Sequence, residues 1–545
     1  MSEFTNALAA AARGGAGLTT GAPGSMRRSG WGEVYAVAGG GAAALAEAGV
    51  RPGDAVALLA AAPVDVAPAA QAVWRAGGSV TMLHQPTART NPSSYARETL
   101  GILRVIGARL VVVGAPFQTL ADQLRQAGVP VLTVADLRSG SAAAAPPVER
   151  GAGDPALLQL TSGSTASPKA VRITHGNLWA NVEAMCAAAD LRAGRDVMVS
   201  WLPLFHDMGM VGFLTMPMCR GMDSVLITPT DFLRDPLRWA ELISTYRGTA
   251  TAAPNFAYAL TARVLARAEA GSLDLSSMRF LLNGAEPIEM PAVEAFLTAG
   301  ARFGLPDTAM VCAYGLAEAT LGVSFHPWGT PVQVDTVDPR ALEEDLRAVP
   351  VPAENGRRLP VLGPPFPGIS VRVVNDSGEP RGNREVGVLQ LKGDSVTELY
   401  LTKDGPQPTR GADGWLDTGD LGYLVDGRVV VCGRVKDVII MGGRNIYPTD
   451  IERVAATVPG VRAGNAVAVR WQAEGRRESY AVAVESKEAT DTAAADRIAT
   501  GVRSAVTAAI GARPALVRVL PPGSLPKTPS GKLQRSAALA LLTAD

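Results

Sequence analysis

The sequence lacks several features that would assign it to common classes of protein. Lys plus Arg and Asp plus Glu both count 51 among 545 residues, so the formal net charge at pH 7 is zero. A chain without an excess of positive charge has no long-range field that attracts a polyanion. We therefore expect no nucleic acid among its partners.

Cysteine is scarce, with four residues in the whole chain. They stand far apart, without the paired spacing of a metal site or the density of a disulfide framework. This usage is typical of a reducing compartment, so we expect a cytoplasmic protein and interpret the four as small core residues. The four are Cys186, Cys219, Cys312 and Cys432.

Long uninterrupted hydrophobic runs are also missing. The most apolar stretch, residues 55–70, is broken by two prolines and by Asp65. The N-terminal segment contains Glu3 and has no basic start. We therefore expect neither a membrane span nor a secretory signal.

The features that are present point to a large α/β protein. Hydrophobic residues make up 47% of the chain, and its length can supply the cores of two or more domains. Strand-like runs at 54–61 and 108–114 alternate with an Ala-rich helical stretch at 35–49. This alternation is typical of strands joined by crossover helices.

The character of the sequence changes near residue 433, where a compact tail with two strand-like runs and one helical stretch begins. We predict an N-terminal domain over 1–433 and a C-terminal domain over 434–545.

One polar loop stands out, LTSGSTASPKAV at residues 160–171. The strand-like runs LLQL and AVRIT flank it, so we expect it to join two strands. Such a loop can present hydroxyls, backbone N–H groups and the ammonium of Lys169 to a phosphate chain. It lacks the G-x-x-x-x-G-K-[ST] spacing of a Walker loop, and taken alone it is equally consistent with a solvated Ser/Thr hairpin.

Six further motifs follow this loop in order. Together with the loop they resemble the adenylate-forming superfamily of acyl-CoA synthetases, adenylation domains and luciferases. The resemblance covers roughly residues 30–540 and implies a large N-terminal body of several subdomains with a small mobile α+β C-terminal domain. The motifs are SWLPLFHDMGMVG at 200–212, LLNGAEPI at 281–288, CAYGLAEATL at 312–321, GWLDTGDLGYLVDGRVVVCGRVKDVI at 414–439, GGRNIYPTDIE at 442–452 and LPKTPSGKLQR at 525–535.

Within the superfamily the sequence is most similar to fatty acyl-AMP ligases of the mycobacterial type. Ala166 and Ala170 stand where CoA-dependent synthetases commonly have Gly, and residues 332–352 stand where those ligases carry an insertion. The resemblance implies activation of a medium- or long-chain fatty acid by ATP and Mg²⁺ to an acyl-adenylate, with release of pyrophosphate. The acyl group would then pass to the phosphopantetheine thiol of an acyl carrier protein or carrier domain. An acyl-CoA synthetase and a non-catalytic binding relative are the alternatives, and we expect a monomer.

The resemblance also implies roles for individual residues around the nucleotide. Glu318 would hold Mg²⁺, Asp420 would accept the ribose hydroxyls and Arg434 would also reach the ribose, although DTGD alone could be a hairpin turn. Thr320 would contact phosphate. The remaining residues expected to bind the nucleotide are Thr161, Ser162, Gly163, Ser164, Thr165 and Lys169 for the phosphates, and Asn283, Gly284, Ala285, Tyr314 and Gly315 for the adenine.

Four residues carry the catalytic prediction. Lys532 would place its charge on the carboxylate and the α-phosphate, an electrostatic role, although a Lys in a C-terminal loop is ordinarily only solvated. Glu318 and Thr161 would act on the metal and phosphates, and His206 would position the acyl and pantetheine groups. Lys436 would be the hinge about which the C-terminal domain rotates between two half-reactions.

The segment 332–352 is expected to hinder that rotation and so to exclude CoA. Its residues DPRALEEDLRA could form a short amphipathic helix that docks through its apolar side. The apolar residues are Val334, Val337, Leu342 and Leu346, and the charged ones are Asp338, Arg340, Glu343 and Glu344.

Overall fold

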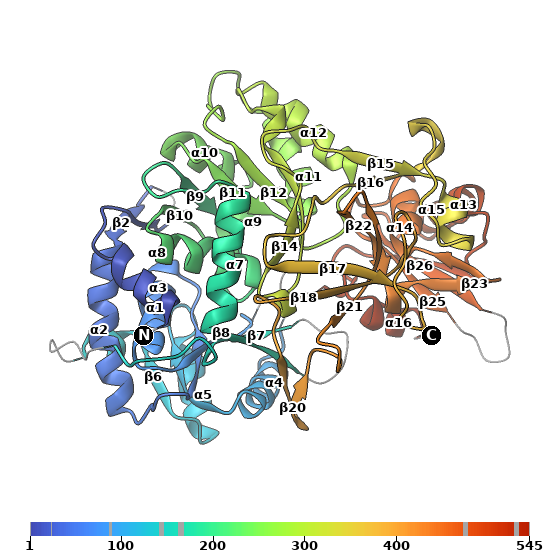
Figure 1. Cartoon of the computed structure of the whole chain (residues 1–545). Helices are drawn as coiled ribbons and strands as arrows, with labels where there is room; N and C mark the ends of the chain where they lie inside the picture. Colours follow the sequence, from blue (N-terminus) through green and yellow to red (C-terminus); the bar gives the residue numbers. More distant parts are fainter. Residues whose placement is uncertain are drawn as a thin grey trace. The chain divides into compact units, whose positions relative to one another are not determined.

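The chain is seen in a computed structural model that describes residues 2–22, 24–86, 90–140, 147–161, 168–471, 478–527 and 533–543. It forms two compact units (Figure 1). Unit 1 comprises Met1–Gln333, Val361–Val371 and Leu391–Asp417, and unit 2 comprises Val334–Pro360, Arg372–Gln390 and Thr418–Asp545.

The first sheet of unit 1 has eight strands in the order β20-β19-β8-β7-β4-β3-β5-β6. Five strands are parallel, namely β3 (Ala55–Leu59), β4 (Ser79–Met82), β5 (Ala108–Val113), β6 (Val131–Thr133) and β7 (Pro155–Leu160). Three are antiparallel, namely β8 (Ala170–Thr174), β19 (Leu399–Thr402) and β20 (Gly405–Pro408). Every residue of β3 is buried, as expected of a parallel strand that is covered on both faces.

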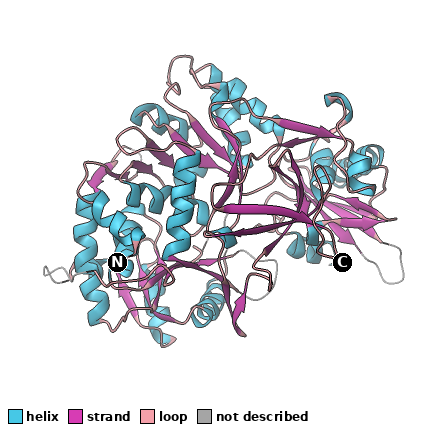
Figure 2. Ribbon diagram, viewed as in Figure 1, coloured by secondary structure: helices cyan, strands magenta, loops and turns pink. Residues whose placement is uncertain are grey.

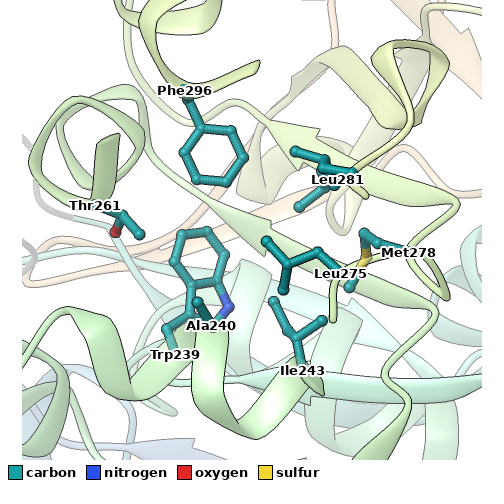
Figure 3. Close-up of a pocket in the computed structure, with 9 residues that line it drawn as sticks. Trp239, Ala240, Ile243, Thr261, Leu275, Met278, Leu281 and Phe296 are labelled. Atoms are coloured by element: carbon teal, nitrogen blue, oxygen red, sulfur yellow. The ribbon is translucent and has the colours of Figure 1, made fainter. Parts of the chain in front are cut away.

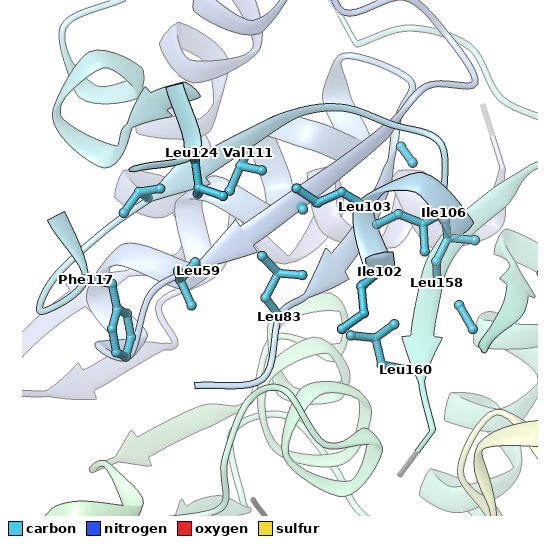
Figure 4. Packing of buried hydrophobic residues seen from close by; sticks show 14 of the residues in the cluster. Leu59, Leu83, Ile102, Leu103, Ile106, Val111, Phe117, Leu124, Leu158 and Leu160 are labelled. Carbon is cyan, nitrogen blue, oxygen red and sulfur yellow. The ribbon is translucent and has the colours of Figure 1, made fainter. Parts of the chain in front are cut away.

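Helices cover this sheet and supply part of its core. The helices are α3 (Pro63–Arg75), α4 (Pro92–Val105), α5 (Gln118–Gln126) and α6 (Val134–Arg138). On one face, Ile102 and Leu103 of α4 pack with Leu158 and Leu160 of β7 (Figure 4). This packing fixes the end of β7, from which the polar loop leaves.

The second sheet of unit 1 also has eight strands, in the order β14-β13-β12-β11-β9-β10-β1-β2. Its strands are β1 (Gly17–Thr20), β2 (Arg27–Gly30), β9 (Val197–Ser200), β10 (Asp223–Leu226), β11 (Ala250–Ala253), β12 (Phe280–Asn283), β13 (Met310–Gly315) and β14 (Gly322–Phe325). The associated helices are α1 (Glu3–Ala11), α2 (Trp31–Glu47), α7 (His175–Ala188), α8 (Met216–Arg220), α9 (Pro229–Arg234), α10 (Leu237–Tyr246), α11 (Asn255–Leu265) and α12 (Met290–Ala301). Because β11, β12 and β13 are parallel neighbours, their carboxyl ends meet at one edge.

In unit 2, helices α14, α15 and α16 pack against the three-stranded sheet β25-β26-β27, helix α13 contacts β24, and two further sheets are the two-stranded pairs β15-β16 and β23-β24. The elements of unit 2 are β15 (Val334–Val337), α13 (Pro339–Glu344), β16 (Arg357–Pro360), β22 (Arg428–Arg434), β23 (Ile439–Met441), β24 (Arg444–Ile446), α14 (Pro448–Ala456), β25 (Ala466–Trp471), β26 (Ser479–Glu485), α15 (Thr492–Ile510), β27 (Leu516–Leu520) and α16 (Arg535–Thr543). A further four-stranded sheet has the order β17-β18-β21-β22, with β17 (Ile369–Val374), β18 (Gly387–Gly393) and β21 (Leu416–Val425).

The α/β class predicted from the sequence is confirmed, since helices and strands alternate along the chain (Figure 2). The strand-like runs at 54–61 and 108–114 are β3 and β5, and the Ala-rich stretch is α2. The predicted boundary between residues 433 and 434 separates the N-terminal domain from a mobile C-terminal domain. It stays a prediction. Among the described residues, no helix is long and apolar enough to cross a membrane.

Candidate active site

The polar loop leaves the first sheet between β7 and β8, as the sequence predicts. Leu160 pairs with Ala170 across the two strands, and the backbone N–H of Thr161 donates to the carbonyl of Lys169 at 3.3 Å. The hydroxyl oxygen of Thr161 is buried and has no hydrogen-bond partner among the described residues. Leaving such a group unpaired costs about 1–3 kcal/mol, so this oxygen is suited to meet a ligand. The loop residues Ser162, Gly163, Ser164 and Thr165 lie outside the described residues.

Lys169 and Glu318 lie together at the base of this loop. The Lys169 Nζ is 3.9 Å from Glu318 Oε1, and the side chain of Glu318 is only 16% exposed. Tyr400 joins them: its hydroxyl donates to the same Oε1 at 2.7 Å, and Lys169 Nζ lies 4.0 Å from the centre of its ring. Burial, followed by the neighbouring Glu318 carboxylate, raises the pKa of the Tyr400 phenol far above its usual value. The phenol therefore remains a donor.

Sequence reasoning missed Tyr400. It lies in β19, which pairs with β8, although the two strands are more than two hundred positions apart in the chain. Only this long-range pairing brings the phenol to Lys169, and no local spacing marks it.

The residues predicted to surround the adenine lie at the carboxyl ends of β12 and β13. Asn283 ends β12, is fully buried, and donates through Nδ2 to Asn255 Oδ1 at 3.1 Å. Ala285 has φ +68°, a left-handed conformation that β-carbon-bearing residues rarely adopt. Gly284 lies between them, directly after the end of the strand.

Gly315 ends β13, directly after Tyr314, where the pairing with β14 is irregular. A Cβ added at Gly315 would lie 2.1 Å from the carbonyl oxygen of Leu321, so only glycine fits this close approach. Tyr314 is largely buried, with 8% exposure.

Thr320 is fully buried in a left-handed conformation, with φ +71°. Strain of this kind costs about 1–3 kcal/mol and is often found at functional sites. Its hydroxyl donates to the carbonyl of Ser395 at 2.7 Å. The contact of Thr320 with phosphate stays a prediction.

Asp420 and Arg434 face each other across β21 and β22 in unit 2. Arg434 Nε is 3.0 Å from Asp420 Oδ1, and the Asp420 side chain is 6% exposed while that of Arg434 is 55% exposed. The DTGD motif is therefore part of a strand rather than the tip of a hairpin. The structure pairs the two residues that the sequence assigns to the ribose.

The predicted hinge residue Lys436 lies in the 3₁₀ turn Val435–Asp437, and Lys532 lies outside the described residues. Sequence reasoning missed Arg535, three positions after Lys532. The guanidinium of Arg535 contacts Asp437 at 3.1 Å and Glu452 of α14 at 2.8 Å. Arg535 thus ties the start of α16 to the predicted hinge.

His206 follows β9 and contacts its neighbour Asp207, with Nδ1 2.6 Å from Oδ1. The preceding Phe205 packs edge-on against the ring of His84, and its carbonyl accepts a hydrogen bond from Gln159 Nε2 at 3.0 Å. Burial, followed by the charge of His206, lowers the pKa of His84 to about 4. Gln159 belongs to β7, so one side chain links the strand of the polar loop to the His206 segment, a link that the sequence did not reveal.

A separate apolar pocket lies in unit 1 between α10, α11, α12 and β12 (Figure 3). The rings of Trp239 and Phe296 face it, with their centroids 6.2 Å apart. The hydroxyl of Thr261 is buried there without a hydrogen-bond partner among the described residues. The remaining lining residues are Ala240, Ile243, Leu275, Met278, Leu281 and Leu305.

Comparison with known families finds a match for the N-terminal part of the chain and another for the C-terminal part. Residues 10–401 match the model of the AMP-binding enzyme family, and residues 443–537 match the model of the AMP-binding enzyme C-terminal domain. The chain belongs to the AMP-binding enzyme family. It is an adenylate-forming ligase that uses ATP, as the order of its motifs indicates.

Relatives of this AMP-binding enzyme include "Putative ligase Rv1013" of Mycobacterium tuberculosis, 52% identical with 100% of each chain covered. The medium-chain-fatty-acid--[acyl-carrier-protein] ligase JamA of Moorena producens is 36% identical over 70% of this chain and 67% of its own. A solved structure from studies of fatty acyl-adenylate ligases of E. coli and L. pneumophila superposes with a TM-score of 0.91. It is 31% identical and covers 99% of this chain and 97% of its own.

Proposed function

We propose that the protein is a fatty acyl-AMP ligase that loads an acyl carrier protein. In the first half-reaction a fatty carboxylate attacks the α-phosphate of ATP, giving acyl-adenylate and pyrophosphate. In the second, the phosphopantetheine thiol of a carrier protein takes the acyl group and AMP leaves. The observation that carries the proposal is the Lys169–Glu318–Tyr400 cluster at the base of a Ser/Thr-rich loop.

That cluster fits a triphosphate with a divalent cation. A carboxylate oxygen together with phosphate oxygens is an ordinary donor set for Mg²⁺, and Glu318 supplies such a carboxylate. When bound, the cation would neutralise charge on the phosphates. Lys169 would place an ammonium on the phosphates, and Thr161 would offer its unpartnered hydroxyl.

Asp420 and Arg434 are suited to hold the ribose. An ionised carboxylate accepts two hydroxyl donors, and Arg434 Nε at 3.0 Å keeps this carboxylate oriented. In the proposal, Lys532 brings its charge to the carboxylate and the α-phosphate during adenylation. Rotation about Lys436 then withdraws it for the second half-reaction.

A fatty acid is favoured over an amino acid as substrate. Amino-acid adenylation domains tend to carry Asp directly after the Phe of this motif, where it pairs with the substrate ammonium. Here His206 follows Phe205. The relative JamA is itself named as a medium-chain-fatty-acid ligase.

The acceptor is proposed to be a carrier protein, because JamA is named for one and because α13 of segment 332–352 is anchored in unit 2. The helix α13 covers Pro339–Glu344, with Leu342 fully buried as expected. Glu343, however, is also buried and paired with Arg444, so the segment docks through a carboxylate as well as an apolar side chain. Relatives named fatty-acid--CoA ligase keep an acyl-CoA synthetase as the second candidate.

The test is ATP–pyrophosphate exchange across fatty acids of graded length, with mass detection of acyl-AMP. We expect exchange that depends on the fatty acid, accumulation of acyl-AMP with CoA alone, and turnover with a phosphopantetheinylated carrier protein. Efficient acyl-CoA synthesis would favour the second candidate, an acyl-CoA synthetase. Absence of exchange with every fatty acid would refute fatty acid activation.

A further inference from the structure

Tyr400 contacts both charged residues at the base of the polar loop. Its hydroxyl donates to Glu318 Oε1 at 2.7 Å, and its ring centre lies 4.0 Å from Lys169 Nζ. Lys169 and Glu318 are themselves 3.9 Å apart, between Nζ and Oε1. One side chain therefore reaches the ammonium and the carboxylate that the proposed function assigns to ATP and its metal.

The backbone around Tyr400 holds it against both partners. Tyr400 pairs with Val171 in β8, two residues after Lys169, so the strand register sets its distance from the ammonium. In the same segment, the N–H of Thr397 donates to the carbonyl of Glu318 at 2.8 Å. The chain on the N-terminal side of Tyr400 is thus bonded to the turn that carries Glu318.

The two halves of the Tyr400 side chain act differently. The hydroxyl makes a hydrogen bond to an ionised group, which is stronger and more directional than a neutral one. The Tyr400 hydroxyl and the Lys169 ammonium both contact Oε1 of Glu318. The ring attracts the ammonium of Lys169 through its face and so restrains a long, flexible side chain.

We propose that Tyr400 is a positioning residue of the nucleotide site: its hydroxyl orients the Glu318 carboxylate, which would hold the metal, and its ring holds Lys169 ready for the phosphates. The inference rests on the proposed function, which supplies the ATP and its cation. It assigns a role to a strand outside the motifs from which the site was predicted.

The two halves can be separated by two substitutions. Tyr400→Phe keeps the ring and removes the hydroxyl, whereas Tyr400→Leu removes both. The measurement is calorimetric binding of a non-hydrolysable ATP analogue, once with excess MgCl₂ and once with EDTA. We expect Tyr400→Phe to weaken binding about ten-fold with Mg²⁺, as for loss of a hydrogen bond to a charged group, and to leave binding in EDTA unchanged. Tyr400→Leu should weaken binding under both conditions, because Lys169 acts on the phosphates without the metal.

Tyr480→Phe is the matched control. Its hydroxyl is also buried and donates at 2.6 Å, but to the carbonyl of Ala512 in the core of unit 2. This control should lower the melting temperature without changing binding of the analogue under either condition.

Three results would overturn the inference: unchanged Mg²⁺-dependent binding in Tyr400→Phe, equal weakening with and without Mg²⁺ in that variant, or an equal loss in the Tyr480→Phe control. If Tyr400→Leu does not fold, the Phe variant decides alone. Failure of the proposed function is seen separately, as wild-type protein without fatty-acid-dependent pyrophosphate exchange, while analogue binding still reports on Tyr400.

Discussion

Glu343 of α13 and Arg444 of β24 form an ion pair within unit 2, with Oε2 and Nη2 2.5 Å apart and the Glu343 side chain buried. Asn445 adds a hydrogen bond from Nδ2 to the carbonyl of Glu343 at 3.2 Å, and Arg444 also donates to the carbonyl of Ile510 at 3.0 Å. Burial raises the pKa of Glu343, and Arg444 opposes that shift. In the chain, the two residues stand on opposite sides of the proposed hinge at Lys436, so rotation about it must separate them.

The first prediction is that Glu343→Ala relaxes the choice of acceptor. Without this carboxylate Arg444 no longer holds α13, so the free-energy cost of the rotation falls by about 1–3 kcal/mol. Acyl-CoA formation from acyl-AMP and CoA should then rise roughly ten-fold. A point variant is a cleaner test than excision of 332–352, because excision also removes β15, whose Asp335 pairs with Arg384.

Glu344→Ala is the control for that variant, since Glu344 Oε1 lies 3.5 Å from Nε of the same Arg444 but its side chain is 51% exposed. It should leave the rate with CoA within two-fold of wild type, as expected of an exposed charge. Equal rates with CoA in wild type and Glu343→Ala would show that this pair does not set the acceptor.

The second prediction separates the half-reactions at Lys532. Lys532→Ala should abolish acyl-AMP formation but leave transfer from preformed acyl-AMP largely intact, because the lysine acts only during adenylation. Lys527→Ala, five positions earlier, removes an exposed ammonium that contacts Asn465 at 2.9 Å and should change neither step. Each half-reaction is measured by mass detection of its product. An equal loss of both half-reactions in Lys532→Ala would contradict the proposal that the C-terminal domain rotates between them and takes Lys532 away from the second.

The sequence predicts the order of elements, because this order depends on local pattern, and its motifs single out candidate site residues. Asp420 and Arg434 illustrate this: both lie in the motif at 414–439, and the structure pairs them across β21 and β22. Tyr400, Gln159 and Arg535 could not be found in this way. Each is placed by strand pairing or by a contact between segments distant in the chain.

Glu343 shows a second limit of sequence reasoning. Helical periodicity placed it among the charged residues of an amphipathic segment, yet its side chain is only 6% exposed. Charged residues are rarely buried unless they are paired. The partner here, Arg444, lies in a strand about a hundred residues later in the chain. Periodicity alone therefore assigns Glu343 to the exposed face of the helix, which is wrong.

The third prediction concerns pH and His175, which begins α7 and is 1% exposed. Burial, with a smaller contribution from Arg150, lowers the pKa of His175 to about 4 from its usual 6.5. Below pH 6.5 the unfolded chain therefore binds a proton that the folded chain does not. Stability is fully present above pH 6.5 and falls as the pH drops toward 4.

At pH 5 this difference amounts to about 2 kcal/mol. His175→Gln removes the titrating group, so its melting temperature should change less than that of wild type between pH 7 and pH 5. Thermal melting at the two pH values tests this. Parallel changes in the two proteins would contradict the shifted pKa.

The last prediction concerns Thr261, whose side chain lines the apolar pocket of unit 1 (Figure 3). Its hydroxyl is buried without a hydrogen-bond partner among the described residues, whereas the nearby Trp239 Nε1 donates to Thr251 at 2.9 Å. Thr261→Val replaces that hydroxyl by a methyl group of similar size, so it removes a desolvation cost and adds apolar contact. We expect the free energy of unfolding to rise by about 1 kcal/mol, measured by denaturant titration. Thr251→Val is the matched control and should lower it, because Trp239 then loses its acceptor. A loss of stability in Thr261→Val would show that the hydroxyl is satisfied in solution, for instance by a bound water in the pocket.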